Sequence, residues 1–123
     1  MNIQTNSGPS PRSIDRIRTA TSSTFEEQVL NAEGPVVAEF MSHGCSHCRA
    51  LEPVLQQAAK TMRPAETIFR VNVPVEQELA TRYDIDGTPT LVMFLGGQEV
   101  GRVEGPSPTL STLLVAVTQP FER

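Results

Sequence analysis

The sequence predicts an α/β domain with a mixed central β-sheet of about five strands, flanked by about four helices. Short β-branched runs alternate with segments of helical periodicity through most of the chain, which favours parallel strands joined by helices. Near the C-terminus, two runs are separated only by Gly96-Gly97, a two-residue turn typical of an antiparallel hairpin. An amphipathic segment over residues 107–118 closes the chain and predicts a last helix.

Each expected element rests on the spacing of its apolar residues. Alternating or continuous β-branched runs indicate strands, and apolar residues three to four positions apart indicate helices. The first helix also has a start signal, because Ser23 and Glu26 have the spacing of a capping box. In chain order, we expect a short edge strand over residues 14–20, a helix over 25–30, a buried strand over 35–41, a helix over 45–62, a strand over 67–73, a helix over 76–83, strands over 90–95 and 98–104, and the helix over 107–118.

Length and composition are those of a single globular domain, with 123 residues, 38% of them hydrophobic and 20% charged. The 10 basic and 14 acidic residues give a net charge of -4, which argues against a nucleic-acid partner. No apolar run approaches the ~20 residues that span a membrane, and the polar first residues lack the core of a secretory signal. We therefore expect a cytoplasmic monomer with a flexible tail over residues 1–13 and one domain over residues 14–123.

The most informative motif is formed by the only two cysteines, Cys45 and Cys48, which lie where the buried strand gives way to a helix. The unpaired N–H groups and positive dipole end of a helix N-terminus favour a thiolate on the first cysteine. In a reducing compartment such a pair is catalytic rather than a structural crosslink. The motif predicts dithiol–disulfide exchange, with Cys45 as nucleophile and Cys48 as the resolving thiol.

The landmarks of this chain resemble those of the thioredoxin family over roughly residues 15–120. They are the strand end Val37-Ala38-Glu39-Phe40, the dithiol Cys45-Ser46-His47-Cys48, Pro53 in the following helix, the loop Gly87-Thr88-Pro89-Thr90, and Gly105 after the last strand. The resemblance implies a thioredoxin fold and a thiol–disulfide oxidoreductase that acts on the disulfides of partner proteins. It also implies that no cofactor or metal is bound, and that a thioredoxin reductase or glutathione returns the electrons.

Glu39 is an acidic residue inside an otherwise apolar strand, so we expect burial to raise its pKa. By resemblance, it accepts the proton of Cys48 through water during resolution. Arg70 matches the position of a lysine that pairs with the family's buried acid, and pairing with Arg70 would instead hold Glu39 ionised. A third interpretation is that Glu39 faces solvent.

The resemblance also predicts a substrate groove opposite the dithiol. It implies a cis bond between Thr88 and Pro89, so that the Thr88 backbone is presented to a bound chain as an added β-strand partner. Gly105 would border the groove, where a side chain would obstruct the substrate backbone. Gly44 leaves the surface beside Cys45 bare, in a place where the family usually has a tryptophan. The chain contains no tryptophan.

His47 separates this motif from that of a typical thioredoxin, which has Gly-Pro between the cysteines. A histidine here stabilises the Cys45 thiolate and predicts a stronger oxidant; the alternative is a solvated side chain with little coupling to the thiols.

Two alternative functions remain on the same fold. One is a disulfide oxidase or isomerase, and the other is a non-catalytic binding or chaperone module. His43, Cys45, His47 and Cys48 are zinc-ligand types, but ligands of structural sites come from separated segments, which disfavours a metal site.

Overall fold

The computed structural model describes residues 15–63 and 66–122, so the tail expected over residues 1–13 lies outside the described residues. The described elements follow the expected order of strands and helices. They are β1 (Arg18–Thr19), the π-helical turn η2 (Glu26–Leu30), β2 (Val36–Met41), α1 (Ser46–Thr61), β3 (Thr67–Asn72), α2 (Gln77–Arg82), β4 (Thr90–Leu95), β5 (Gln98–Glu104), α3 (Leu110–Thr118) and the 3-10 turn η3 (Gln119–Phe121). No helix of the described part is long and apolar enough to cross a membrane.

The five strands form one mixed sheet in the order β1-β3-β2-β4-β5. The strands β1, β3 and β2 run parallel, whereas β4 and β5 form the predicted antiparallel hairpin. The central strand β2 is buried along its whole length, as its β-branched sequence predicts. Its register sets Glu39 beside Arg70 on β3 and Leu91 on β4. The mixed α/β sheet predicted from the sequence is therefore confirmed.

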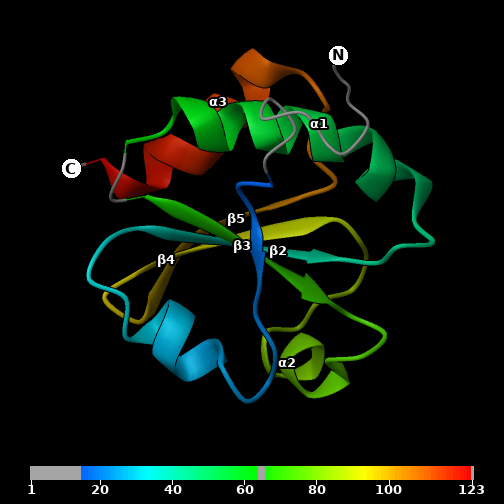
Figure 1. The fold of residues 1–123 in the computed structure, drawn as a ribbon, viewed down its shortest axis with the longest axis vertical. Coiled ribbons are helices and arrows are strands. Elements are labelled where there is room, and N and C mark those ends of the chain that lie inside the picture. The colour runs from blue at the N-terminus through cyan, green and yellow to red at the C-terminus, as the bar shows by residue number, and fades with distance from the viewer. Residues whose placement is uncertain (1–14, 64–65, 123) are drawn as a thin grey trace, which may run out of the picture.

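Helices cover both faces of the sheet, with α1 and α3 on one face and α2 and η2 on the other (Figure 1). Because side chains alternate along a strand, β2 contributes Val37 to the core beneath α1 and α3, and Phe40 to the opposite core. The second core holds Tyr83, whose ring centroid lies 5.5 Å from that of Phe25 and 5.3 Å from that of Phe94. The two cores hold β2 from both sides and fix the end that leads to the cysteines.

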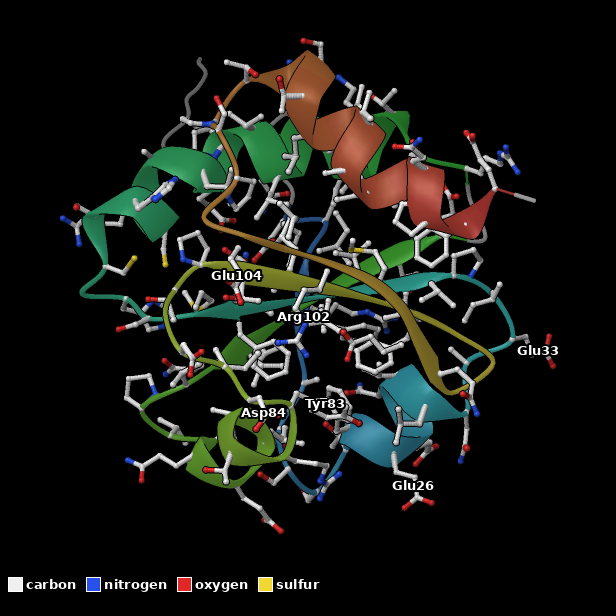
Figure 2. All side chains as sticks on the ribbon, turned by 180° about the vertical axis from the view of Figure 1, so that it is seen from behind. Glu26, Glu33, Tyr83, Asp84, Arg102 and Glu104 are labelled. Atoms are coloured by element: carbon white, nitrogen blue, oxygen red, sulfur yellow. The ribbon has the colours of Figure 1, made fainter. Side chains whose placement is uncertain are left out.

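Arg102 connects the edge strand β5 to the end of α2. Its guanidinium donates to the Tyr83 carbonyl oxygen at 2.8 Å and pairs with Glu99 at 2.9 Å. Figure 2 shows Arg102 between Glu104 and the Tyr83–Asp84 turn. The carbonyl at the C-terminal end of α2 thus gains a donor that the short helix does not supply.

Two expected helix starts are wrong. The capping box is not formed, since η2 has no side-chain cap; Ser23 Oγ lies 3.0 Å from Thr21 Oγ1 instead. The last helix begins at Leu110 rather than at residue 107. Ser107 precedes a proline, which disfavours the helical conformation, and Thr109 is extended with φ -116° and ψ 140°.

Gly96 and Gly97 make the hairpin turn with φ of 60° and 80°, in the left-handed region. A Cβ on Gly97 would lie 3.1 Å from the Leu30 backbone oxygen, whereas one on Gly96 would meet nothing within 4 Å. The two glycines therefore share their backbone conformation and differ in the space around them.

We expect Gly97→Ala to lower the free energy of unfolding by about 2 kcal/mol, and Gly96→Ala by about 1 kcal/mol. Both alanines must adopt positive φ, but only the one at position 97 also crowds a backbone oxygen. Urea unfolding followed by circular dichroism measures the difference. Equal losses for the two variants would contradict this account of the turn.

Candidate active site

The two cysteines occupy different environments at the start of α1. Cys45 is the N-cap residue of the helix and is partly exposed, whereas Cys48 is 3% exposed. The Cys45 sulfur accepts a hydrogen bond from the Cys48 backbone N–H at 3.1 Å. Both residues are free thiols. A sulfur in the N-cap position receives an N–H that the helix leaves unpaired, which favours a thiolate there.

These environments separate the two thiol pKa values. Burial alone would raise the pKa of Cys45, but hydrogen bonds from the side chains of Cys48 and Thr88, and from the backbone N–H groups of Cys48 and His47, lower it below its ordinary value. Burial and the hydrogen bond to Cys45 raise the pKa of Cys48 to about 11. The exposed thiol is therefore the more acidic, which is the order that a nucleophile and a resolving thiol require.

The loop before β4 packs directly against Cys45. The Thr88–Pro89 peptide bond is cis, as the resemblance predicts, and the Cys45 thiol donates to the Thr88 carbonyl oxygen at 3.5 Å. The Gly105 N–H donates to the Pro89 carbonyl oxygen at 2.8 Å, with Gly105 at φ 56°. Three segments that are distant in the sequence thus meet at the dithiol.

The His47 ring reaches the same loop region. Its Nε2 lies 3.0 Å from the Pro106 carbonyl oxygen, and its Cε1 would lie 3.6 Å from a Cβ on Gly105. His47 is half-buried, so its ring is only partly exposed to solvent. Gly44, in contrast, is exposed, and a Cβ there would meet only Ser42 Oγ at 4.0 Å. The surface beside Cys45 is open, as expected.

Comparisons with known proteins agree with this geometry. The thioredoxin family model matches residues 16–118. The chain belongs to the thioredoxin family. It is 36% identical over 96 residues to thioredoxin 1 of Nostoc sp., which covers 76% of this chain and 90% of the relative. It is 30% identical over 83 residues to thioredoxin of Pseudomonas aeruginosa, covering 68% of this chain and 77% of the relative.

The solved structures include a mutant thioredoxin from Halobacterium salinarum with a TM-score of 0.74 and 25% identity, covering 87% of this chain and 91% of that one. The thioredoxin fold implied by the sequence is therefore confirmed. Members of the thioredoxin family are disulfide oxidoreductases, and the Cys45–Cys48 pair fits that chemistry. The protein is a thiol–disulfide oxidoreductase of the thioredoxin family.

Glu39 lies in β2 on the sheet face beneath α1, as its alternation with Phe40 requires. It is fully buried, and neither carboxyl oxygen has a hydrogen-bond partner among the described residues. Its pKa is raised to about 8, chiefly by burial; the charges of Glu52 and Cys45 contribute to this rise, and that of Arg70 opposes it. The expected burial and raised pKa are confirmed, and the solvent-facing interpretation is wrong.

The alternative pairing of Glu39 with Arg70 is also wrong. The Arg70 guanidinium pairs with Glu52 at 2.7 Å and with Asp15 at 3.1 Å. Sequence reasoning missed both acids. A signal was available for Glu52, because it follows Cys48 by four residues and so lies on the same face of α1 one turn later. No comparable signal marks Asp15, which is 55 residues away from Arg70.

Cys48, Glu52 and Arg70 line a cavity of about 220 Å³, together with Met41, Ser42, His43 and Arg49. The buried thiol therefore borders a space that also contains a carboxylate and a guanidinium. Within residues 15–63 and 66–122, no group of three or more His, Cys, Asp or Glu side chains is arranged to hold a metal ion.

The raised pKa of Glu39 predicts a pH-dependent stability. The folded state binds the Glu39 proton more tightly than the unfolded state, so this contribution is present below the ordinary pKa and is lost as pH rises through about 8. We expect the free energy of unfolding to fall by about 3 kcal/mol between about pH 5 and about pH 8, and this fall to be absent in Glu39→Gln.

Urea unfolding at a series of pH values measures both proteins. Asp15 does not interfere, because its pKa is lowered to about 2, chiefly by its hydrogen bond with Arg70, and it stays ionised throughout this range. Parallel pH curves for the wild type and the Gln variant would show that Glu39 does not titrate as described.

Proposed function

We propose that this protein reduces the disulfides of partner proteins, with Cys45 as the attacking thiolate and Cys48 as the resolving thiol. The observation that carries the proposal is the pairing of a partly exposed thiol of lowered pKa with a buried thiol whose pKa is raised to about 11. A nucleophile must be accessible and ionised, whereas a resolving thiol must stay protonated until the mixed disulfide has formed.

In the first step, the Cys45 thiolate attacks one sulfur of the substrate disulfide. A new S–S bond forms to Cys45, the substrate bond breaks, and the leaving sulfur departs as a thiolate that takes up a proton. In the second step, Cys48 loses its proton and attacks the Cys45 sulfur, which releases the second substrate thiolate. Two electrons have then passed to the substrate, and the protein carries a Cys45–Cys48 disulfide.

We assign Glu39 as the group that accepts the Cys48 proton through water. Its raised pKa of about 8 makes it a stronger base than an ordinary carboxylate, when it is ionised. The negative charge of Cys45 contributes to that rise. Formation of the mixed disulfide removes this charge, so Glu39 ionises more readily at the step that needs a base.

We place the substrate chain against the cis-proline loop. In the resting state, the Thr88 carbonyl oxygen accepts a hydrogen bond from the Cys45 thiol. When Cys45 loses its proton, this oxygen becomes free to accept a hydrogen bond from a backbone N–H of an extended substrate. Gly44 and Gly105 border this surface without side chains. The open surface suits a substrate backbone that lies across the dithiol.

After each turnover the protein carries a Cys45–Cys48 disulfide, which a donor must reduce before the next substrate. A relative in Mycobacterium leprae, 32% identical over 85 residues, is named a bifunctional thioredoxin reductase/thioredoxin. We propose that a reductase of that type, or glutathione, reduces the Cys45–Cys48 disulfide of this protein. We also propose that it acts as a monomer in the cytoplasm, where its two free thiols suit a reducing environment.

Cysteine variants test the assignment in an insulin reduction assay with dithiothreitol. We expect the wild type to accelerate the reduction, and Cys45→Ser to lose this activity because it lacks the nucleophile. Cys48→Ser should accumulate a mixed disulfide, which non-reducing gels and mass spectrometry detect. A binding or chaperone module would give no acceleration with any variant. Retained activity in Cys45→Ser would refute the assignment of the nucleophile.

A second test concerns His47, for which we propose a shift of the dithiol toward oxidising power. His47→Pro would remove both the ring and a backbone N–H that lowers the Cys45 pKa, so His47→Leu, which keeps the N–H, is the matched control. We expect equilibration with glutathione to show a more reducing dithiol in both variants, with the larger change in His47→Pro. If neither equilibrium moves, His47 does not tune the dithiol.

A further inference from the structure

Glu39 and Arg70 are direct neighbours in the sheet. They occupy matching register positions on the parallel strands β2 and β3, and both alternate away from the core that contains Phe40 and Val71. A buried carboxylate beside an arginine would ordinarily form an ion pair. The absence of that pair among the described residues calls for a physical cause.

The cause lies in the partners that Arg70 has. One terminal nitrogen is 2.7 Å from Glu52 on α1, and the other is 3.1 Å from Asp15 and 2.9 Å from the Ile17 carbonyl oxygen. The guanidinium is thus held between the segment that precedes β1 and the helix α1. Its burial, which opposes ionisation, is outweighed by these acidic partners, which raise its pKa.

Gln56 fixes the two acids in place. Its side-chain nitrogen donates to Asp15 at 2.7 Å and to Glu52 at 2.9 Å. Glu52 and Gln56 are four residues apart on α1, so both lie on one helix face, where Glu52 pairs with Arg70 and Gln56 binds Asp15. The arrangement is a connected network rather than an isolated surface pair, and such networks hold side chains in one position better than single pairs do.

We propose that Glu52 is a positioning residue, which draws the Arg70 guanidinium toward α1 and Asp15 and thereby leaves the buried Glu39 carboxyl unpaired. The inference deepens the proposed function, because it rests on Glu39 as the base for Cys48. Glu52 acts from the wall of the cavity of about 220 Å³ that it shares with Arg70 and Cys48.

Three charged or titratable groups act on Glu39, two of them from α1 and its N-cap and one from β3. They are Glu52 on α1, Arg70 on β3 and Cys45 at the start of α1, added to the effect of burial. Glu52 raises the pKa of Glu39 directly through its negative charge, and Arg70 lowers it. By occupying the guanidinium, Glu52 also prevents the shorter contact that would lower this pKa much more.

This placement has a consequence for the resolving step. A Glu39 paired with Arg70 would have a low pKa, and its carboxylate would be a weak base toward Cys48, a thiol whose pKa is raised by burial. An unpaired Glu39 has a pKa nearer to that of Cys48, so the transfer of a proton from Cys48 to Glu39 is less unfavourable. Glu52 thus favours resolution without touching the reacting sulfurs.

The test is Glu52→Gln, which removes the charge and keeps the shape of a half-exposed side chain. We expect the titration midpoint of Glu39, followed by NMR of its labelled carboxyl carbon in the reduced protein, to fall by about one pH unit. The pH midpoint of mixed-disulfide resolution should fall with it. A Glu39 midpoint equal to that of the wild type would overturn the proposal.

Two further variants separate positioning from simple repulsion. Asp15→Asn removes the other acid of the network but leaves Glu52 on Arg70, so the Glu39 midpoint should stay near the wild-type value. In an Arg70→Gln background, Glu52→Gln should shift the midpoint much less than it does alone, because no guanidinium is released. An equal shift in both backgrounds would mean that Glu52 acts by repulsion only, and the positioning role would be rejected.

The NMR measurement also distinguishes this proposal from the proposed function. It needs no substrate, so a protein that failed to exchange disulfides would still show the Glu39 shift. Conversely, normal insulin reduction with an unchanged Glu39 midpoint would reject Glu52 as a positioning residue and leave the exchange mechanism intact.

Discussion

The burial of β2 in the middle of the sheet is the constraint on which the rest of the structure depends. Hydrogen bonds to β3 on one side and β4 on the other hold the strand in a fixed register, and every one of its side chains is buried. Two consequences follow from this one placement. The strand ends at Met41, shortly before Cys45, and it carries Glu39 into the apolar layer beneath α1, where a carboxylate is costly to ionise. The reactive sulfurs and the buried acid are therefore positioned by the same packing.

Two chemically identical thiols differ here only through what surrounds them. Cys45 sits where the helix offers unpaired N–H groups and beside the loop at Thr88. Cys48, three residues later, has turned into the protein and borders a small cavity. Cys45 is the N-cap residue, at the exposed end of the helix, whereas Cys48 belongs to the first turn, which is packed against the sheet. Contacts with the Thr88 loop and the His47 backbone N–H add to this difference.

Much of this arrangement could be predicted from the sequence, because it depends on local patterns. Periodicity located β2 to β5, and the spacing of Cys45 and Cys48 located the start of α1. What could not be predicted depends on side chains that meet across the fold. Arg70 could have been assigned to Glu39, Glu52 or Asp15, and only the packing of α1 on the sheet decides among them. Likewise, the partner of the His47 ring is a carbonyl oxygen 59 residues away in a loop, and no periodicity marks it.

The aromatic core on the far side of the sheet has a practical consequence. The chain has no tryptophan and a single tyrosine, Tyr83, which is packed against Phe25 and Phe94. Its ultraviolet emission therefore comes from one ring on the sheet face away from α1, so it reports whether that core is intact. The sulfurs belong to the start of α1, which covers the opposite face of the sheet. Optical studies of electron exchange in this protein thus require an added chromophore beside the helix, while its native emission serves as an independent gauge of folding.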